Sequence, residues 1–111
     1  MRQYLIDELR AEDYTKLQEH LQANYKNSSG IPGVFWIELP DELLNPTQLK
    51  HKSCYPFYIA VDLEKTFISF ELLVRTKTSL RCECISYSNE KQRNWIIEKV
   101  DSIFNELKIV Y

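Results

Sequence analysis

The spacing of apolar residues changes twice along the chain and divides it into helical and extended parts. Near the C-terminus, apolar positions recur at offsets of 4, 7, 8 and 11, which is the period of one helix face. Asn89 precedes this segment and Gln92 lies three positions further on, at the spacing of a capping box. We therefore expect a helix from about Glu90 to Lys108. Its apolar stripe consists of Ile96, Val100, Ile103, Phe104 and Leu107.

The same periodicity predicts a helix near the N-terminus. The pattern ends in the segment KNSSGIPG at 26–33, whose glycine and proline residues stop a helix. Residues 2–9 either extend this helix or form a separate short element. The apolar stripe of the predicted helix consists of Tyr14, Leu17, Leu21 and Tyr25.

Between the two helices, apolar and polar residues alternate, which is the period of strands with one buried face. The connections between the last three of these segments are short, so we expect them to form an antiparallel meander. In the last segment, Leu80, Cys82 and Cys84 are expected to share one face. The four predicted strands are VFWIEL at 34–39, FYIAVDL at 57–63, FISFELLVR at 67–75 and LRCECISY at 80–87.

A short helix is expected in the connection between the first strand and the meander. Asn45 can cap it, Pro46 suits its first turn, and Gln48 follows. The order is then helix, strand, short helix, three strands and helix. Helices at the ends of an antiparallel sheet predict an α+β two-layer sandwich, with both long helices on one face of a four-stranded sheet. We expect residues 1–111 to form one such domain.

The composition agrees with a globular domain, since 44% of the 111 residues are hydrophobic, 27% are charged and two are glycines. The N-terminus lacks the apolar stretch of a signal peptide, and no segment approaches the roughly 20 apolar residues that cross a bilayer. Three cysteines, an odd number without an export signal, favour reduced thiols over a disulfide framework. We therefore expect a cytoplasmic protein that does not associate with membranes.

The net charge of −2 hides an asymmetry, because residues 1–44 carry −4 and residues 45–94 carry +3. This basic half is weaker than the strongly basic surface of most nucleic-acid-binding domains, so a nucleic-acid partner is not our leading expectation. A weak module that stacks bases and binds phosphates stays an alternative. Its residues would be Arg75, Lys77, Arg81, Lys91 and Arg93, beside Tyr87 and Trp95.

Two helices, each about 10 Å across, cover only one face of four strands that lie about 4.8 Å apart. The other face either lies under the N-terminal segment or the 40–55 connection, or it binds a partner. Aromatic and arginine residues on this face are typical of recognition surfaces. Our leading hypothesis is a non-enzymatic interaction domain that uses the outer sheet face for homodimerisation or for a protein partner. The expected contact residues are Trp36, Tyr58, Leu73, Arg75 and Tyr87.

The second hypothesis is a structural zinc site. His51 and Cys54 form an H-x-x-C motif, Cys82 and Cys84 form C-x-C, and all four side chains are zinc ligands. The C-x-C half fits poorly on a strand, where alternate residues lie about 6.6 Å apart, because two thiolates on one zinc are about 3.8 Å apart.

Other interpretations of the cysteines stay open. Cys82 and Cys84 are expected to be small buried core residues, with a strained disulfide between them as an alternative, and Cys54 could pair with either across space. Cys54 with His51 is a local Cys and His pair of the kind found in nucleophilic catalysis. Because no oxyanion hole or orienting carboxylate is recognisable, we do not expect an enzyme.

Overall fold

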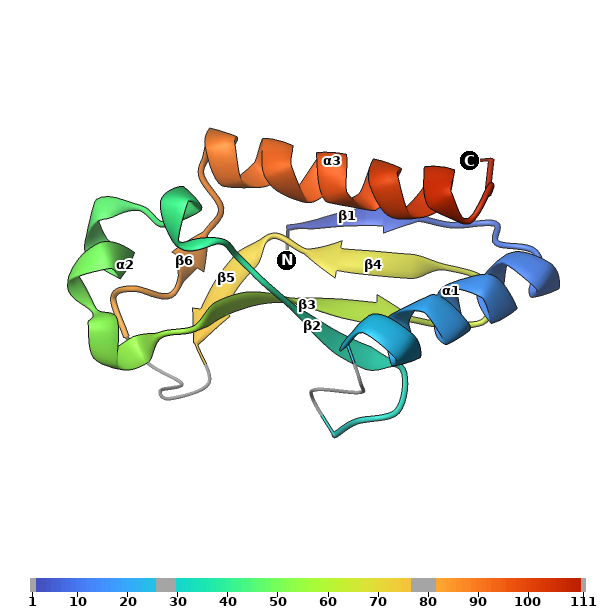
Figure 1. Ribbon diagram of the computed structural model, residues 1–111, viewed down its shortest axis with the longest axis horizontal. Coiled ribbons are helices and arrows are strands. Elements are labelled where there is room, and N and C mark those ends of the chain that lie inside the picture. Colours follow the sequence, from blue (N-terminus) through green and yellow to red (C-terminus); the bar gives the residue numbers. More distant parts are fainter. Residues whose placement is uncertain (1, 26–29, 77–81, 111) are drawn as a thin grey trace.

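The computed structural model describes residues 2–25, 30–76 and 82–110. Its strands form one antiparallel sheet, and two long helices lie beside it (Figure 1). The α+β fold predicted from the sequence is therefore confirmed, with six strands in place of four. The elements are β1 (Gln3–Ile6), α1 (Ala11–Tyr25), β2 (Val34–Glu38), the short 3-10 helix η1 (Asp41–Leu43), α2 (Pro46–Lys50), a second 3-10 helix η2 (Lys52–Cys54), β3 (Phe57–Leu63), β4 (Ile68–Glu71), β5 (Leu73–Thr76), β6 (Ser86–Tyr87) and α3 (Glu90–Glu106).

The sheet is organised around β3. One side of β3 pairs with β2, and the other side pairs with β4 along part of its length and with β5 along the rest. β1 then adds to β4, and β6 adds to β5. Because every one of these pairs is antiparallel, the predicted meander of the last three strands is confirmed.

The strand predicted over 67–75 is interrupted at Leu72. The register of β4 against β3 differs by two residues from that of β5 against β3, which is the mark of a bulge. The backbone of Leu72 forms hydrogen bonds with the segments next to β1 and β6 and not with β3. Its N–H donates to the Arg2 carbonyl at 3.1 Å, and its carbonyl accepts from the Ser88 N–H at 2.7 Å. The bulge therefore separates β4, which pairs with β1, from β5, which pairs with β6.

The segment 2–9, which the sequence left open, forms a separate element. Residues Gln3–Ile6 are β1, paired with β4 so that Tyr4 stands opposite Phe70. Glu8 adopts a φ of 56°, a left-handed conformation in which the chain turns from β1 toward α1. The N-terminus of the described chain therefore extends the sheet and does not lengthen the helix.

The prediction of a strand over 80–87 is wrong at Cys82–Ile85 and correct at Ser86–Tyr87. Cys82–Ile85 form a turn, closed by the Ile85 N–H donating to the Cys82 carbonyl at 3.0 Å, and only Ser86–Tyr87 continue as a strand. Residues 80 and 81 lie outside the described residues. The alternation of apolar and polar residues suggested a strand. In the structure, however, the Cys84 carbonyl accepts a hydrogen bond from the Gln48 side chain at 3.2 Å and not from the backbone of a neighbouring strand.

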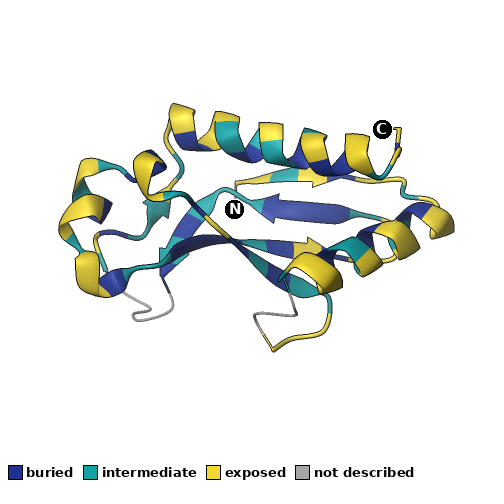
Figure 2. Cartoon of the chain, viewed as in Figure 1, coloured by how far each residue is buried: buried dark blue, intermediate teal, exposed yellow. Residues whose placement is uncertain are grey.

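The hydrophobic core lies between the sheet and the two long helices, on the face that the alternation predicted (Figure 2). Both apolar stripes of the predicted helices point into it, except that Tyr14, Tyr25 and Leu107 are half-buried at its margin. Within the described ranges, no helix combines the length and the apolar character that a membrane crossing requires. The most deeply buried side chains include Leu17, Leu21, Phe35, Phe57, Ile59, Val61, Ile68, Phe70, Ile96 and Phe104.

Two capping boxes meet inside this core. Asn45 caps α2 and Asn89 caps α3, each in reciprocal hydrogen bonds with the glutamine three residues on, as predicted. Both glutamines are fully buried, and the Gln92 amide donates to Gln48 Oε1 at 2.9 Å and to the Leu43 carbonyl at 2.9 Å. This network joins the start of α3 to the connection between β2 and β3.

Candidate functional site

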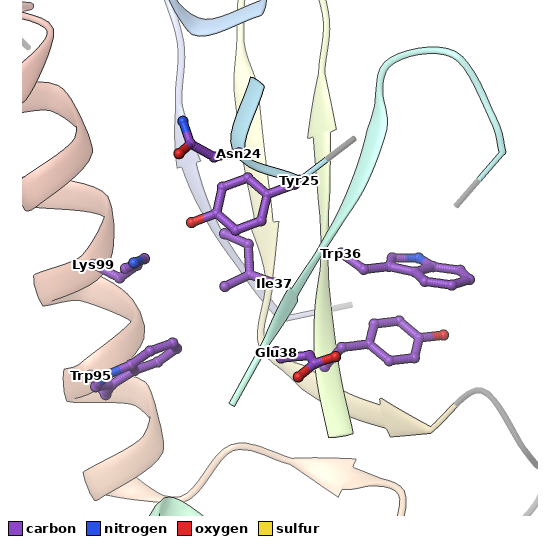
Figure 3. Close-up of a pocket in the computed structure, with 8 residues that line it drawn as sticks. Asn24, Tyr25, Trp36, Ile37, Glu38, Trp95 and Lys99 are labelled. Atoms are coloured by element: carbon purple, nitrogen blue, oxygen red, sulfur yellow. The ribbon is translucent and has the colours of Figure 1, made fainter. Parts of the chain in front are cut away.

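A strip of aromatic and arginine side chains crosses the face of the sheet that α3 does not cover. The Trp36 side chain points away from α3 (Figure 3), and the centroid of its ring lies 4.5 Å from that of Tyr58. In the register of the sheet, Tyr58 stands opposite Arg75, and Leu73 stands opposite Tyr87. We call this the outer strip: Arg2, Trp36, Tyr58, Leu73, Arg75 and Tyr87.

The members of the outer strip differ in exposure. Tyr87 is 41% exposed, and Trp36, Leu73 and Arg75 are half-buried. Tyr58 was predicted as a contact residue, but only 7% of its surface is exposed. Tyr58 therefore supports the Trp36 ring from within the strip and presents little surface of its own.

Charge pairs hold the strip in place. Arg75 Nε donates to Glu71 Oε1 at 2.5 Å, and this hydrogen bond raises the pKa of Arg75. Burial raises the pKa of the Tyr58 phenol, an effect that the nearby Arg75 opposes. The Arg2 guanidinium lies 5.0 Å from the centroid of the Tyr87 ring, a cation–π distance. Arg2 was not predicted for this site, because only the addition of β1 to the sheet brings it there.

A recess of about 340 Å³ runs along β2. Trp36 borders it from the outer side, whereas Tyr25, Trp95 and Lys99 border it from the helix side (Figure 3). The nucleic-acid alternative grouped Trp95 with Tyr87, but Tyr87 belongs to the outer strip. The two rings therefore do not form one stacking surface, and Lys77 and Arg81 of that alternative lie outside the described residues.

A second constellation forms at the end of the sheet where α2 lies (Figure 1). The Sγ atoms of Cys54, Cys82 and Cys84 all lie within 4.8 Å of one another, and Cys54 Sγ is 3.9 Å from Cys82 Sγ. Cys54 ends η2, whereas the other two belong to the turn before β6. The turn, in place of a strand, allows the two sulfurs of the C-x-C motif to approach. We call these three residues the thiol cluster.

The thiols of the cluster are free and unequal. Cys84 is fully buried, Cys54 is 9% exposed and Cys82 is half-buried, so two of the three are core residues. Hydrogen bonds from the Cys84 thiol and backbone N–H lower the pKa of Cys82, and the N–H lies 3.4 Å from its sulfur. Burial, together with hydrogen bonding to Cys82 and Cys54, raises the pKa of Cys84 to about 12.

His51, the fourth predicted ligand, lies beside the cluster without belonging to it. Its Nδ1 is 2.6 Å from the Thr47 carbonyl, and its Nε2 is 3.5 Å from Glu83 Oε1. A carbonyl only accepts, so Nδ1 carries a proton, and Nε2 makes an ion pair with the Glu83 carboxylate when it is protonated too. Among the described residues, no hydrogen bond joins the ring to the Cys54 thiol, so the Cys and His pair is not arranged as a nucleophile and its base.

The thiol pKa values predict how stability depends on pH in the metal-free, reduced protein. In the unfolded chain both thiols titrate near pH 9, whereas folded Cys84 keeps its proton to about pH 12 and folded Cys82 loses its proton below pH 9. The free energy of unfolding should therefore rise toward pH 9, because folded Cys82 ionises first. It should fall above pH 9, because unfolded Cys84 ionises first.

Urea unfolding at a series of pH values, with a chelator and a reductant present, measures this dependence. Cys84→Ala should remove the decline just above pH 9. A decline that is unchanged in this variant would contradict the assignment to Cys84.

No protein-family model matches the chain, and comparisons with curated proteins and with solved structures also give no match. The function of the chain therefore has to be inferred from the outer strip and the thiol cluster.

Proposed function

We propose that this chain is a non-enzymatic, cytoplasmic interaction domain that forms a homodimer through the outer face of its sheet. The observation that carries this proposal is the outer strip, in which the strand register and ring contacts place aromatic, leucine and arginine side chains next to one another on one face of the sheet. Aromatic and arginine residues are the types that contribute most to binding at protein interfaces.

The extent of the sheet supports a second copy as the occupant. Its central strands run along the longest axis of the molecule, which measures 42 Å (Figure 1). A standard interface takes about 800 Å² from each partner, and a long, continuous sheet face offers a surface on which such an interface can form.

The charges on the face support self-complementarity. Glu38 and Asp62 lie on β2 and β3, whereas Arg2 lies toward the opposite edge, where Arg75 is paired with Glu71. In a pair whose two-fold axis runs along the strands, the β2 side of one copy faces the opposite side of the other, so Glu38 and Asp62 approach Arg2 of the second copy. Electrostatic complementarity of this kind favours the correct register of two partners.

Contacts within the outer strip already fix some of its side chains, which reduces the conformational entropy that they lose on binding. Trp36 is already stacked on Tyr58, and Arg75 is already held by Glu71. Side chains that are fixed in the free protein lose less conformational entropy when they bind, which raises affinity.

Sedimentation equilibrium of the full chain tests the proposal. The wild type should be a reversible dimer, and Leu73→Asp should weaken the dimer on the order of 100-fold, because it places a charge in the middle of the buried face. Trp36→Ala should weaken it at least about tenfold, through loss of an aromatic anchor. Both variants should keep the circular dichroism spectrum of the wild type.

Leu49→Asp is the matched control. Leu49 is 45% exposed on α2, outside the outer strip, so the same change of leucine to aspartate should leave the dimer intact. A wild type that stays monomeric at all concentrations would overturn the proposal. A dimer that tolerates both Leu73→Asp and Trp36→Ala would also overturn it.

A further inference from the structure

The thiol cluster lies where η2 meets the turn before β6, and its residues are not part of the outer strip. Its three sulfurs come from two segments that are 28 residues apart, and they converge in space to within 4.8 Å of one another. When three thiolates bind one zinc ion at about 2.3 Å, tetrahedral geometry places their sulfurs about 3.8 Å apart. The 3.9 Å between Cys54 Sγ and Cys82 Sγ already matches this spacing.

The backbone that carries each thiol is fixed by hydrogen bonds. The Cys54 N–H donates to the His51 carbonyl at 2.9 Å, and the Cys54 carbonyl accepts a short hydrogen bond from the Thr76 hydroxyl. Cys84 is held through its carbonyl by the buried Gln48 amide at 3.2 Å. The sulfurs are thus placed by the fold itself, so ordering them costs little when an ion binds.

His51 has the arrangement of a metal-binding histidine. Ligand histidines usually donate their second ring N–H to a carbonyl or a carboxylate, which fixes the tautomer and the ring orientation. The Nδ1 of His51 makes this contact with the Thr47 carbonyl, and Nε2 is directed toward Glu83, the residue between Cys82 and Cys84. Nε2 therefore lies next to the turn that carries two of the three thiols.

The Cys84 N–H supplies an outer contact to the cluster. It donates to Cys82 Sγ at 3.4 Å, and a donor of this kind stabilises the negative charge on a thiolate ligand. Three sulfurs and one imidazole nitrogen are soft or borderline ligands, which select zinc over magnesium or calcium. A site with four protein ligands leaves no position open for a substrate or for water, which is the mark of a structural ion.

We propose that Cys54, Cys82, Cys84 and His51 bind one structural Zn²⁺ ion in tetrahedral geometry, with the His51 ring moving from Glu83 to the ion. The ion links the α2–η2 segment to the turn before β6, and through that turn to α3. This site is independent of dimerisation through the outer strip.

Cobalt(II) titration of the full chain tests the site. The protein is reduced, stripped with a chelator and checked for three free thiols per chain before the titration. We expect one equivalent of Co²⁺ to give the absorption of tetrahedral cobalt, with sulfur-to-cobalt charge transfer of three thiolates, and Zn²⁺ to displace it stoichiometrically. Zn²⁺ should also raise the melting temperature, since it binds the folded state.

The variants separate the roles of the four ligands. Each of Cys54→Ser, Cys82→Ser and Cys84→Ser should lower Zn²⁺ affinity at least about 100-fold, because a coordinating thiolate is lost. His51→Asn should lower it at least about tenfold and shift the ligand-field bands while leaving three-thiolate charge transfer. Glu83→Gln should bind zinc as the wild type does, which distinguishes His51 from Glu83 as the fourth ligand.

His20→Asn is the matched control for the histidine, because His20 lies on α1 beside Glu106 and outside the cluster. It should bind zinc and cobalt as the wild type does. A folded, fully reduced protein that gives no tetrahedral cobalt spectrum would overturn the site. A spectrum that persists unchanged in His51→Asn would overturn the four-ligand assignment, and formation of a Cys54–Cys82 disulfide without metal binding would show a redox pair in its place.

Discussion

Replacing Gln92 with methionine is expected to lower the free energy of unfolding by about 3 to 5 kcal/mol, although the two side chains are similar in length. Gln92 is fully buried, and its amide donates to the Leu43 carbonyl and to Gln48 Oε1. Its own Oε1 accepts from the Asn89 N–H at 3.0 Å. Methionine makes none of these bonds, so the Leu43 carbonyl and the Asn89 N–H lose this partner, and Gln48 Oε1 keeps only its hydrogen bond from the Asn45 N–H. Each buried polar group that loses a partner costs about 1 to 3 kcal/mol.

Urea denaturation measures this loss as a shift of the transition midpoint. Gln22→Met is the matched control, because Gln22 is exposed on α1 and the same change there should stay within about 0.5 kcal/mol. A loss of less than about 1 kcal/mol in Gln92→Met would mean that water replaces the network. The paired capping boxes would then not be what joins α2 to α3.

Phe70→Ala is expected to destabilise the protein by about 3 to 5 kcal/mol, the usual cost of removing a buried phenylalanine. Phe70 is 1% exposed in β4, between Tyr4 of β1 and Val61 of β3, and it faces the helices. The ring leaves a cavity between the sheet and the helices. The backbone of β4 cannot move to fill this cavity, because it is hydrogen-bonded to β1 on one side and to β3 on the other.

Leu5→Ala is the control for this substitution. Leu5 lies in the same strand pair, opposite Ser69 and next to the position of Phe70, but it is 46% exposed on the other face of the sheet. Its truncation should cost less than about 1 kcal/mol. Thermal or urea unfolding of both variants compares the two faces directly, and a larger loss in Leu5→Ala would reverse the assignment of inner and outer faces.

The long helices and the phase of the long strands were predictable, because each is specified by residues close together in the chain. The stripe from Ile96 to Phe104 and the Asn89 cap lie within one helix, and they place α3 within two residues of its observed end. In β3 the alternation extends over seven residues, enough to fix which face is buried. Local periodicity therefore identified the residues on the inner face of the sheet. The residues between them in each strand are then those of the outer face.

The shorter elements depended on partners far away in the sequence. β1 has four residues, too few to show the alternation of a strand in the sequence. It forms by pairing with β4, where Tyr4 stands opposite Phe70. The residues of the turn at Cys82–Ile85 alternate between apolar and polar as a strand does. The Cys84 carbonyl, however, is hydrogen-bonded to the buried Gln48 amide of α2. Leu72 interrupts a segment that reads as continuous, because two different strands complete its backbone hydrogen bonds.

By itself, the sequence determined the α+β class, the helices and the residues that face the core, and it named the side chains of both candidate sites except Arg2. Only the tertiary structure decided which of them meet. Cys82 and Cys84 both lie near Cys54 because the chain turns there, whereas a strand would have kept their two sulfurs apart. Arg2 reaches Tyr87 because β1 joins the sheet. Periodicity reports burial one residue at a time, whereas a site is a set of distances between segments, and those distances are set by the packing of the whole chain.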